Sequence, residues 1–135
     1  METLKAVIDT DLLIDFLRNE KQATRFIAYL EGKNAVLATT SVNIFELYHG
    51  AHKSGACKKN VEAIKVLTDR LTVLSLTSRA AQKAGYLYAQ LECQGQLIGL
   101  RDTLIAAIAL TREFSVATRN QTHFSLISGL KIITP

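Results

Sequence analysis

The sequence is poor in the residues that interrupt or cross-link a chain. Its 135 residues contain one proline, which is the last residue, and two cysteines, and they contain no tryptophan. No stretch rich in glycine, serine and proline offers a linker, so we expect a single domain over residues 1–135. Cys57 and Cys93 lie far apart, and neither belongs to a CxxC pair. This pattern favours two free thiols over a disulfide.

The sequence also lacks a long apolar run and a recognisable leader. Its longest apolar stretch, LIAAIAL at 104–110, is far too short to cross a bilayer. The first residues, METLKAVID, resemble neither a signal peptide nor a transit peptide. We therefore expect a cytoplasmic protein with no membrane partner. Apolar residues make up 48% of the chain, which is enough for a compact core.

The charge is modest in total but unevenly distributed. The formal net charge is +4, and basic residues gather at 18–25 and again at 53–65. Such groups are typical of solvated helix surfaces, and a protein that handles a polyanion also carries them. The charge alone leaves both interpretations open.

Short apolar segments alternate with stretches of helical periodicity. The pattern predicts strands at 4–8, 35–39, 71–76, 114–118 and 131–134, and helices at 11–18, 20–31, 41–51, 58–69, 78–94 and 100–113. Asp11 is a candidate cap of the first helix, and Thr40 or Ser41 is a candidate cap of the third. Strands that alternate with helices form a parallel sheet covered on both faces. We therefore predict an α/β fold, a three-layer α/β/α sandwich around a central, mostly parallel sheet.

Three carboxylates lie at the points where apolar segments meet helices. Asp9 ends LKAVI, Glu46 lies within SVNIFELYHGA, and Asp102 lies near the start of LRDTLIAAIAL. Sites in parallel sheets form at the carboxyl ends of strands, so the three side chains can converge on one edge. Carboxylates gathered in this way repel one another unless a cation lies among them. The spacing therefore predicts a divalent-metal site.

Each of the three also has a simpler structural explanation. Asp9 could be a turn residue or a helix cap, and Asp102 lies in a first helical turn, where the helix dipole favours negative charge. Glu46 is the anomaly, because apolar residues such as Phe45 surround it in the sequence. We expect it to be partly desolvated unless it has a partner or a metal.

The other acidic and histidine residues fit such a site less well. Capping explains Asp11, and Asp15 is expected to face water. His49, His52 and His123 are scattered and form no cluster with zinc-like spacing. The oxygen-liganded hard cation Mg²⁺ or Mn²⁺ is therefore the consistent choice.

Four segments carry a resemblance to a known family. In this order, the chain contains VIDTDLLIDFL, TTSVNIFELYHGA, IGLRDTLIAAIAL and VATRNQTHFSLISGLKI. Together they resemble the PIN-domain nucleases, specifically the VapC-type toxins of toxin–antitoxin pairs, from near residue 4 to the C-terminus. Each segment is weak alone, but four in the right order and spacing make a specific match. By position, the resemblance implies that Asp9 and Asp102 are the main metal ligands and that Glu46 is the third acidic residue.

The resemblance also assigns roles near the last strands. The fourth family position falls at Asn120, where many members have Asp; an amide brings no charge, which leaves a second metal open. Ser41 and Thr118 match small hydroxyl residues that hydrogen-bond carboxylates or substrate, although a helix cap explains Ser41 equally well. For His123 and Phe124 we expect packing or a role in holding the loop.

The activity that the resemblance implies is endoribonuclease chemistry on an RNA substrate. A bound metal would activate a water and polarise the scissile phosphate. Asp9 and Asp102 would hold the ion, Glu46 would orient or deprotonate the water, and Asn120 and Thr118 would position the phosphate. The family further implies a homodimer and a cognate antitoxin.

Basic residues close to these segments are candidates for contacts with the RNA backbone. They are Arg101, Arg119 and Lys53. The sequence shows no aromatic stacking platform, so it does not indicate which RNA is recognised.

Two other functions are compatible with parts of the sequence. Asp9 and Asp11 form a DxD pattern that resembles the nucleophile motif of haloacid-dehalogenase phosphatases, but VATRNQTHF lacks the late acidic pair of that chemistry. A non-catalytic PIN-like module that binds RNA or a partner is the second alternative, and Asn120 is the residue that favours it.

Overall fold

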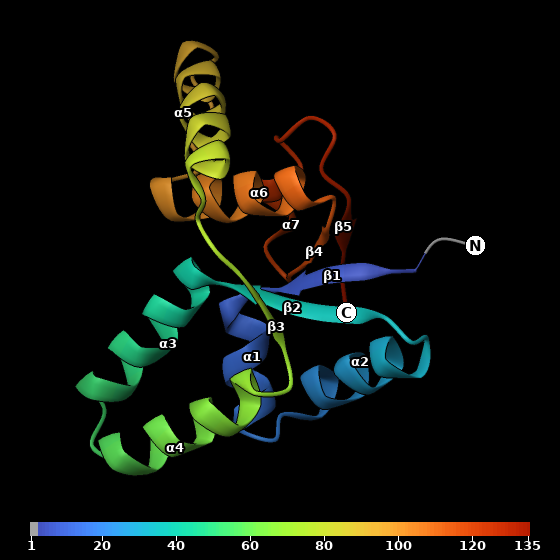
Figure 1. The fold of residues 1–135 in the computed structure, drawn as a ribbon, viewed down its shortest axis with the longest axis vertical. Coiled ribbons are helices and arrows are strands. Elements are labelled where there is room, and N and C mark those ends of the chain that lie inside the picture. The colour runs from blue at the N-terminus through green and yellow to red at the C-terminus, as the bar shows by residue number, and fades with distance from the viewer. Residues whose placement is uncertain (1–2) are drawn as a thin grey trace.

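Strands and helices alternate along the chain in the computed structural model, which describes residues 3–135 (Figure 1). The strands are β1 (Lys5–Ile8), β2 (Val36–Thr40), β3 (Thr72–Leu74), β4 (Ser115–Ala117) and β5 (Ile132–Ile133). The helices are α1 (Thr10–Leu17), α2 (Lys21–Gly32), α3 (Ser41–Lys53), α4 (Cys57–Thr68), α5 (Ser78–Cys93), α6 (Leu100–Arg112) and α7 (Gln121–Phe124).

The strand β1 is the centre of a five-stranded parallel sheet with the order β3-β2-β1-β4-β5. Val7 lies opposite Ala38 of β2 and Val116 of β4. Residues 6–8 are fully buried, and such a continuous apolar run is typical of a strand covered on both faces. The carboxyl end of β1 therefore opens in the middle of the sheet, and Asp9 is the residue that follows it.

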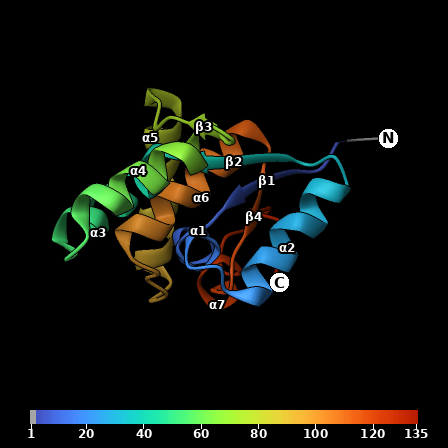
Figure 2. The same ribbon diagram turned by 90° about the horizontal axis from the view of Figure 1, so that it is seen from below.

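Helices cover the two faces of this sheet in separate layers. The helices α1 to α4 lie on one face and α5 to α7 on the other (Figure 1). Ala6 and Ile8 of β1 pack into the first layer, and Val7 packs into the second, as the alternation of side chains along a strand requires. Seen from below, α1 lies between α2 and α3 (Figure 2). The predicted α/β class and its three-layer arrangement are confirmed.

Two helix starts near the end of β1 differ in detail from the predicted ones. The cap of α1 is Asp9, whose side chain accepts a hydrogen bond from the Thr10 N–H. The prediction that Asp11 caps this helix is wrong, because Asp11 lies inside the first turn. Thr40 caps α3, and Ser41 is the first residue of that helix.

The remaining elements agree with the prediction to within a few residues. The strands β3, β4 and β5 are shorter than predicted. The helix α7 was not predicted, since four residues are too few to show helical periodicity.

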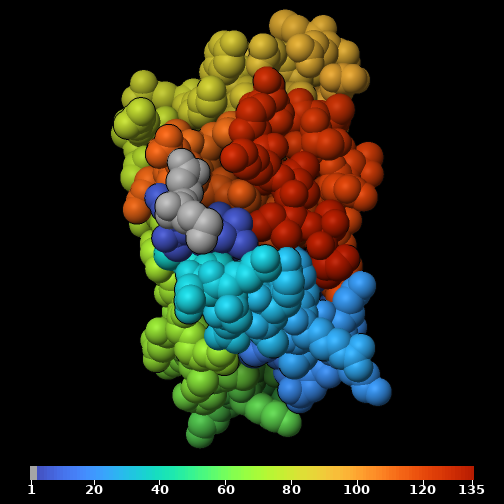
Figure 3. Space-filling model, turned by 90° about the vertical axis from the view of Figure 1, so that its right-hand side faces the viewer, coloured from blue at the N-terminus to red at the C-terminus, as the bar shows by residue number. Residues whose placement is uncertain are grey.

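The outer helices each bury one stripe and expose the rest. In α2 the buried residues are Ala23, Phe26, Ile27 and Leu30, which follow helical spacing. The exposed side of α2 forms part of the face in Figure 3, where this helix (light blue) lies between the C-terminal segment (red) and the α3–α4 segment (green). Within residues 3–135, none of the helices has the length and apolarity that a membrane span requires.

Candidate active site

Asp9 lies at the junction of β1 and α1. Its backbone N–H donates to the Ala117 carbonyl of β4 at 2.9 Å, so the neighbouring strand fixes its position. Its Oδ1 accepts from the Thr10 N–H at 2.8 Å, and its Oδ2 accepts from the Thr118 hydroxyl at 2.8 Å. Asp9 is only 2% exposed. Burial of a carboxylate is costly, and these donors offset that cost.

Glu46 reaches the same position from α3. Its Oε1 accepts from the Thr10 hydroxyl at 2.7 Å, and this hydroxyl accepts from the Asn43 amide at 2.8 Å. Asn43 is fully buried and forms a capping box with Thr40. Glu46 is partly desolvated and has a hydrogen-bond partner, which fits the expectation from the sequence, although its apolar sequence neighbour Phe45 is 68% exposed. Successive helical residues point about 100° apart, so sequence neighbours of Glu46 do not share its surroundings.

Asp102 is held in the first turn of α6. The helix begins after Gly99, whose φ of +93° lies in the region that favours glycine. Asp102 is 5% exposed, and its Oδ2 lies 2.8 Å from His123 Nδ1 and 3.3 Å from the amide nitrogen of Asn120, which donates to it. The segment after β4 therefore orients this carboxylate, and the helix N-terminus favours its charge.

The guanidinium group of Arg101 lies among all three carboxylates. Its Nη2 donates to Asp9 Oδ1 at 2.8 Å, its Nε donates to Glu46 Oε2, and its Nη1 donates to Asp102 Oδ1. A planar group with several donors is suited to such bridging. Burial lowers the pKa of Arg101, but the hydrogen bond to Glu46 and the charge of Asp9 outweigh it and raise the pKa above its ordinary value. The structure thus brings the three predicted carboxylates together around a cation that belongs to the chain.

A further acidic side chain, Asp11, lies close to this cluster. Burial raises the pKa of Asp11, the negative charge of Asp9 raises it further, and the charge of Arg101 lowers it in part. Burial is the largest cause of this net rise, so the negative charge of Asp11 is held at a cost to stability.

Arg119 is bound to acidic and amide groups at the edge of α1 and α2. It forms an ion pair with Asp15 and donates to Glu20 and to Gln22, each at 2.9 Å. The side chain of Asp15 is 31% exposed, so it faces water in part, and its carboxylate is paired with Arg119 at the surface. Hydrogen bonds from two backbone N–H groups of α2 lower the pKa of Glu20, and Arg119 lowers it further by a smaller effect. Of the three candidate RNA-binding cations, Lys53 and Arg119 are exposed and Arg101 is half-buried.

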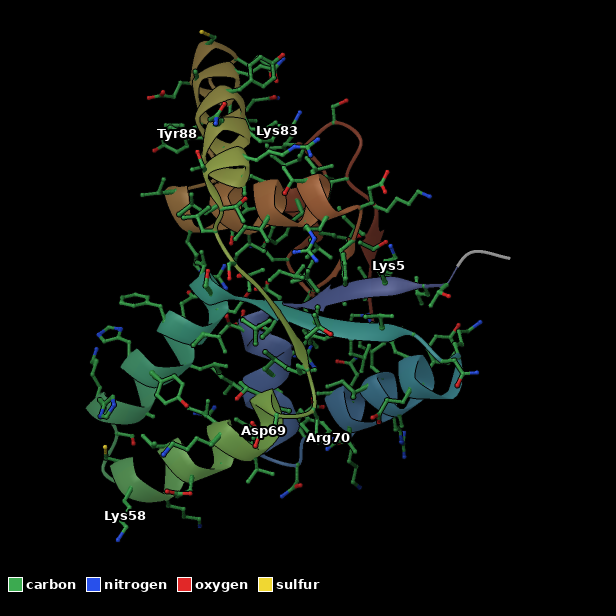
Figure 4. The ribbon with its side chains drawn as sticks, viewed as in Figure 1. Lys5, Lys58, Asp69, Arg70, Lys83 and Tyr88 are labelled. Carbon is green, nitrogen blue, oxygen red and sulfur yellow. The ribbon has the colours of Figure 1, made fainter. Side chains whose placement is uncertain are left out.

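The other basic side chains are spread over the surface. Lys58 on α4 and Lys83 on α5 lie at opposite ends of the molecule (Figure 4). Arg70 forms an ion pair with Glu31 at 3.0 Å, on the side of the sheet covered by α1 to α4. The labelled cations in this view therefore mark separate parts of the surface.

The two predicted hydroxyl residues have different surroundings. The Thr118 hydroxyl donates to Asp9 and accepts from the Asn120 N–H at 2.9 Å, and its side chain is buried. The Ser41 hydroxyl accepts from the Leu76 N–H at 3.0 Å, which ties the segment after β3 to α3. Thr118 is thus part of the carboxylate network. For both hydroxyls a contact with substrate stays a prediction.

The segment after β4 contributes two polar side chains and one apolar anchor. Asn120 donates to Asp102, and the Asn120 amide nitrogen lies 3.0 Å from His123 Nδ1. Phe124 is fully buried in the core on the α5–α6 side, as the predicted packing role requires. His123 contacts a site carboxylate directly, which goes beyond the role in holding the loop that the sequence indicates.

The donor set is chemically suited to a hard divalent cation. The groups that face Arg101 are carboxylate oxygens, which Mg²⁺ and Mn²⁺ prefer. The guanidinium already bound there shows that the position attracts positive charge. Across residues 3–135, no three acidic, histidine or cysteine side chains are arranged to hold a metal ion as they stand. The guanidinium of Arg101 lies between the carboxylate oxygens instead.

Two residues that build the site were not recognised from the sequence. Thr10 and Asn43 form the hydrogen-bonded connection that orients Glu46. A signal existed for each: Thr10 directly follows Asp9, and Asn43 lies three residues after Thr40, at the reciprocal position of a capping box.

Comparisons of the sequence and the fold with known proteins identify one family. Residues 6–129 match the family model described as the PIN domain. The tRNA(fMet)-specific endonuclease VapC of Shigella flexneri is 32% identical over 129 residues, which cover 95% of this chain and 96% of the relative. The chain therefore belongs to the PIN-domain family and, within it, to the VapC-type members.

Solved structures agree with this assignment. A chain of the DNA-bound VapBC structure from Salmonella typhimurium is 30% identical, with a TM-score of 0.87 and coverage of 98% of each chain. A chain of VapBC2 from Rickettsia felis, bound to a promoter DNA fragment, has a TM-score of 0.89 at 23% identity and covers 98% of this chain and 99% of that one. The second comparison supports the fold alone.

Proposed function

We propose that this protein is a VapC-type toxin, an endoribonuclease that cleaves RNA with Mg²⁺ or Mn²⁺ at Asp9, Glu46 and Asp102. The observation that carries the proposal is the meeting of these three carboxylates at the carboxyl end of the central strand. Relatives named as ribonucleases or endonucleases support the reaction class. Neither the phosphatase nor the non-catalytic alternative has a comparable observation in its favour.

The burial and contacts of each site residue suggest its role in the reaction. Asp9 and Asp102 are buried and rigidly held, so they are the residues to hold the ion. Glu46 is a quarter exposed and lies at the rim, where it can orient a water or accept its proton. When bound, the divalent ion would supply positive charge beside the scissile phosphate. Asn120 is placed beside Asp102, from where its amide can position a phosphate oxygen.

The test is RNA cleavage by the purified protein with and without Mg²⁺ or Mn²⁺. We expect wild type to cut, and Asp9→Asn and Asp102→Asn to lose nearly all activity while they stay folded by circular dichroism. Asp69→Asn is the matched control, because Asp69 is exposed near the end of α4, far from the site (Figure 4). Equal cleavage by all four proteins would contradict the site, and no cleavage of any RNA by wild type would contradict the activity. The initiator tRNA is the first substrate to try, given the name of the Shigella relative.

The toxin role adds a partner to this proposal. Structural relatives are VapBC complexes, so we propose a cognate antitoxin that binds this chain. A small neighbouring gene whose product co-purifies with the protein and suppresses its cleavage is the expected finding. We also propose a cytoplasmic homodimer, and light scattering coupled to gel filtration measures that assembly.

A further inference from the structure

The three site carboxylates share one pattern of hydrogen bonding. Each has one oxygen held by groups other than Arg101: Asp9 Oδ2 by the Thr118 hydroxyl, Glu46 Oε1 by the Thr10 hydroxyl, and Asp102 Oδ2 by the Asn120 amide and His123 Nδ1. Because these bonds do not involve Arg101, they hold the carboxylates in place with or without it.

The second oxygen of each carboxylate faces the same group. Asp9 Oδ1, Glu46 Oε2 and Asp102 Oδ1 accept from three different nitrogens of the Arg101 guanidinium. Three anionic oxygens around one group favour a cation there, and small shifts of the side chains would bring them within reach of a smaller ion. A divalent ion bound there would take the place of the guanidinium, since one position cannot hold both.

The side chain of Arg101 can move away from the carboxylates without unfolding of the protein. Its side chain is 34% exposed, whereas those of Asp9 and Asp102 are 3% and 7% exposed. It belongs to the first turn of α6, and its long stem can swing toward water while the helix stays in place. The carboxylates are therefore the buried part of the site, and the arginine is the part with access to water.

We propose that Arg101 is an internal counter-cation, which holds the carboxylates together in the metal-free protein and which Mg²⁺ or Mn²⁺ displaces on binding. This inference rests on the proposed metal-dependent function. It makes metal binding an exchange of one cation for another, so the arginine lowers the metal affinity of the site. It also keeps the metal-free site from being a cluster of unbalanced negative charge.

Calorimetric titration with Mn²⁺ tests the exchange. We expect Arg101→Gln to bind Mn²⁺ at least tenfold more tightly than wild type, and to melt at a lower temperature without metal. Added Mn²⁺ should raise its melting temperature by more than that of wild type. Arg79→Gln is the matched control, because Arg79 is exposed at the start of α5 and the change removes the same charge. An Arg101→Gln affinity within twofold of Arg79→Gln would overturn the inference.

Two further measurements separate the possible failures. If Asp102→Asn abolishes Mn²⁺ binding but Arg101→Gln leaves it unchanged, the inference is wrong and the proposed function stands. If neither the wild type nor any of the variants binds Mn²⁺, the metal dependence of the proposed function is wrong.

The side-chain Nε–H resonance of Arg101, identified by its loss in Arg101→Lys, gives a measurement on the wild-type protein. Saturating Mg²⁺ should remove its protection from solvent exchange. Unchanged protection would overturn the inference even if Arg101→Gln does not fold.

Discussion

The hydroxyl of Thr118 offers the sharpest test of how the site is held together. Thr118→Val replaces this hydroxyl by a methyl group of nearly the same size, so the change removes hydrogen bonds without leaving a cavity. Two bonds are lost: the one to Asp9 Oδ2 at 2.8 Å and the one from the Asn120 N–H at 2.9 Å. The side chain is 1% exposed, and water cannot easily replace the lost donor.

The expected loss in the free energy of unfolding is the sum of the contributions of the two hydrogen bonds. A buried hydrogen bond to a charged group contributes roughly 1.5–3 kcal/mol, and the bond to the partly exposed Asn120 N–H contributes about 0.5–1 kcal/mol. We therefore expect Thr118→Val to lower the free energy of unfolding by about 2–4 kcal/mol. For a chain of this size, that corresponds to a fall in melting temperature of roughly 6–15 °C.

Urea and thermal unfolding followed by circular dichroism measure this loss. Thr118→Ser is the control, because it keeps the hydroxyl and should cost only about 1 kcal/mol for the missing methyl group. In the background of Asp9→Asn, Thr118→Val should cost less, with a coupling of roughly 1–2 kcal/mol between the two positions. A Val variant as stable as wild type, or a Ser variant as unstable as Val, would refute the reasoning.

Two further predictions concern neighbours of the same carboxylates. Thr10→Val removes the donor to Glu46 and leaves the buried Asn43 amide without its acceptor, so it should destabilise the fold by about 1–3 kcal/mol. Thr10→Ser keeps the hydroxyl and should retain most of the stability. The midpoints of urea unfolding of the two variants and of wild type measure the difference. Asp11→Asn should stabilise the protein at pH 7. The raised pKa of Asp11, relative to an ordinary value of 3.8, means that its ionisation costs stability as pH rises, and protonation removes that cost. The advantage of the Asn variant should therefore shrink as the pH falls through the raised pKa and be absent below about pH 4, and an advantage independent of pH would exclude this explanation.

The sequence predicts the positions of the site carboxylates well, because their placement follows from topology. Asp9 ends a buried strand, and the carboxyl end of a central parallel strand is where sites form. The alternation of strands and helices was enough to expect the layers of the fold. Short elements such as α7 were missed, because four residues are held by Phe124 in the core and not by any local pattern.

The partners of those carboxylates could not be predicted in the same way. Arg101 directly adjoins Asp102 in the sequence, yet it also reaches Asp9 and Glu46 from elsewhere in the fold. Nothing local distinguishes an arginine that turns inward from one that faces solvent, since both follow the same helical spacing. Glu46 is partly buried, as its sequence neighbours suggested, but it is not buried against Phe45, which helical rotation places at the surface.

The hydrogen bond between Asp9 and Thr118 joins residues that are 109 positions apart. The strand that carries Asp9 is therefore made early, but the strand that completes its surroundings is made late. Contacts of such long sequence separation form only after the intervening chain has been brought together. During synthesis, the early carboxylates must remain without their full set of partners until β4 docks beside β1. A partly made chain thus cannot contain the assembled carboxylate cluster before the fold is nearly complete.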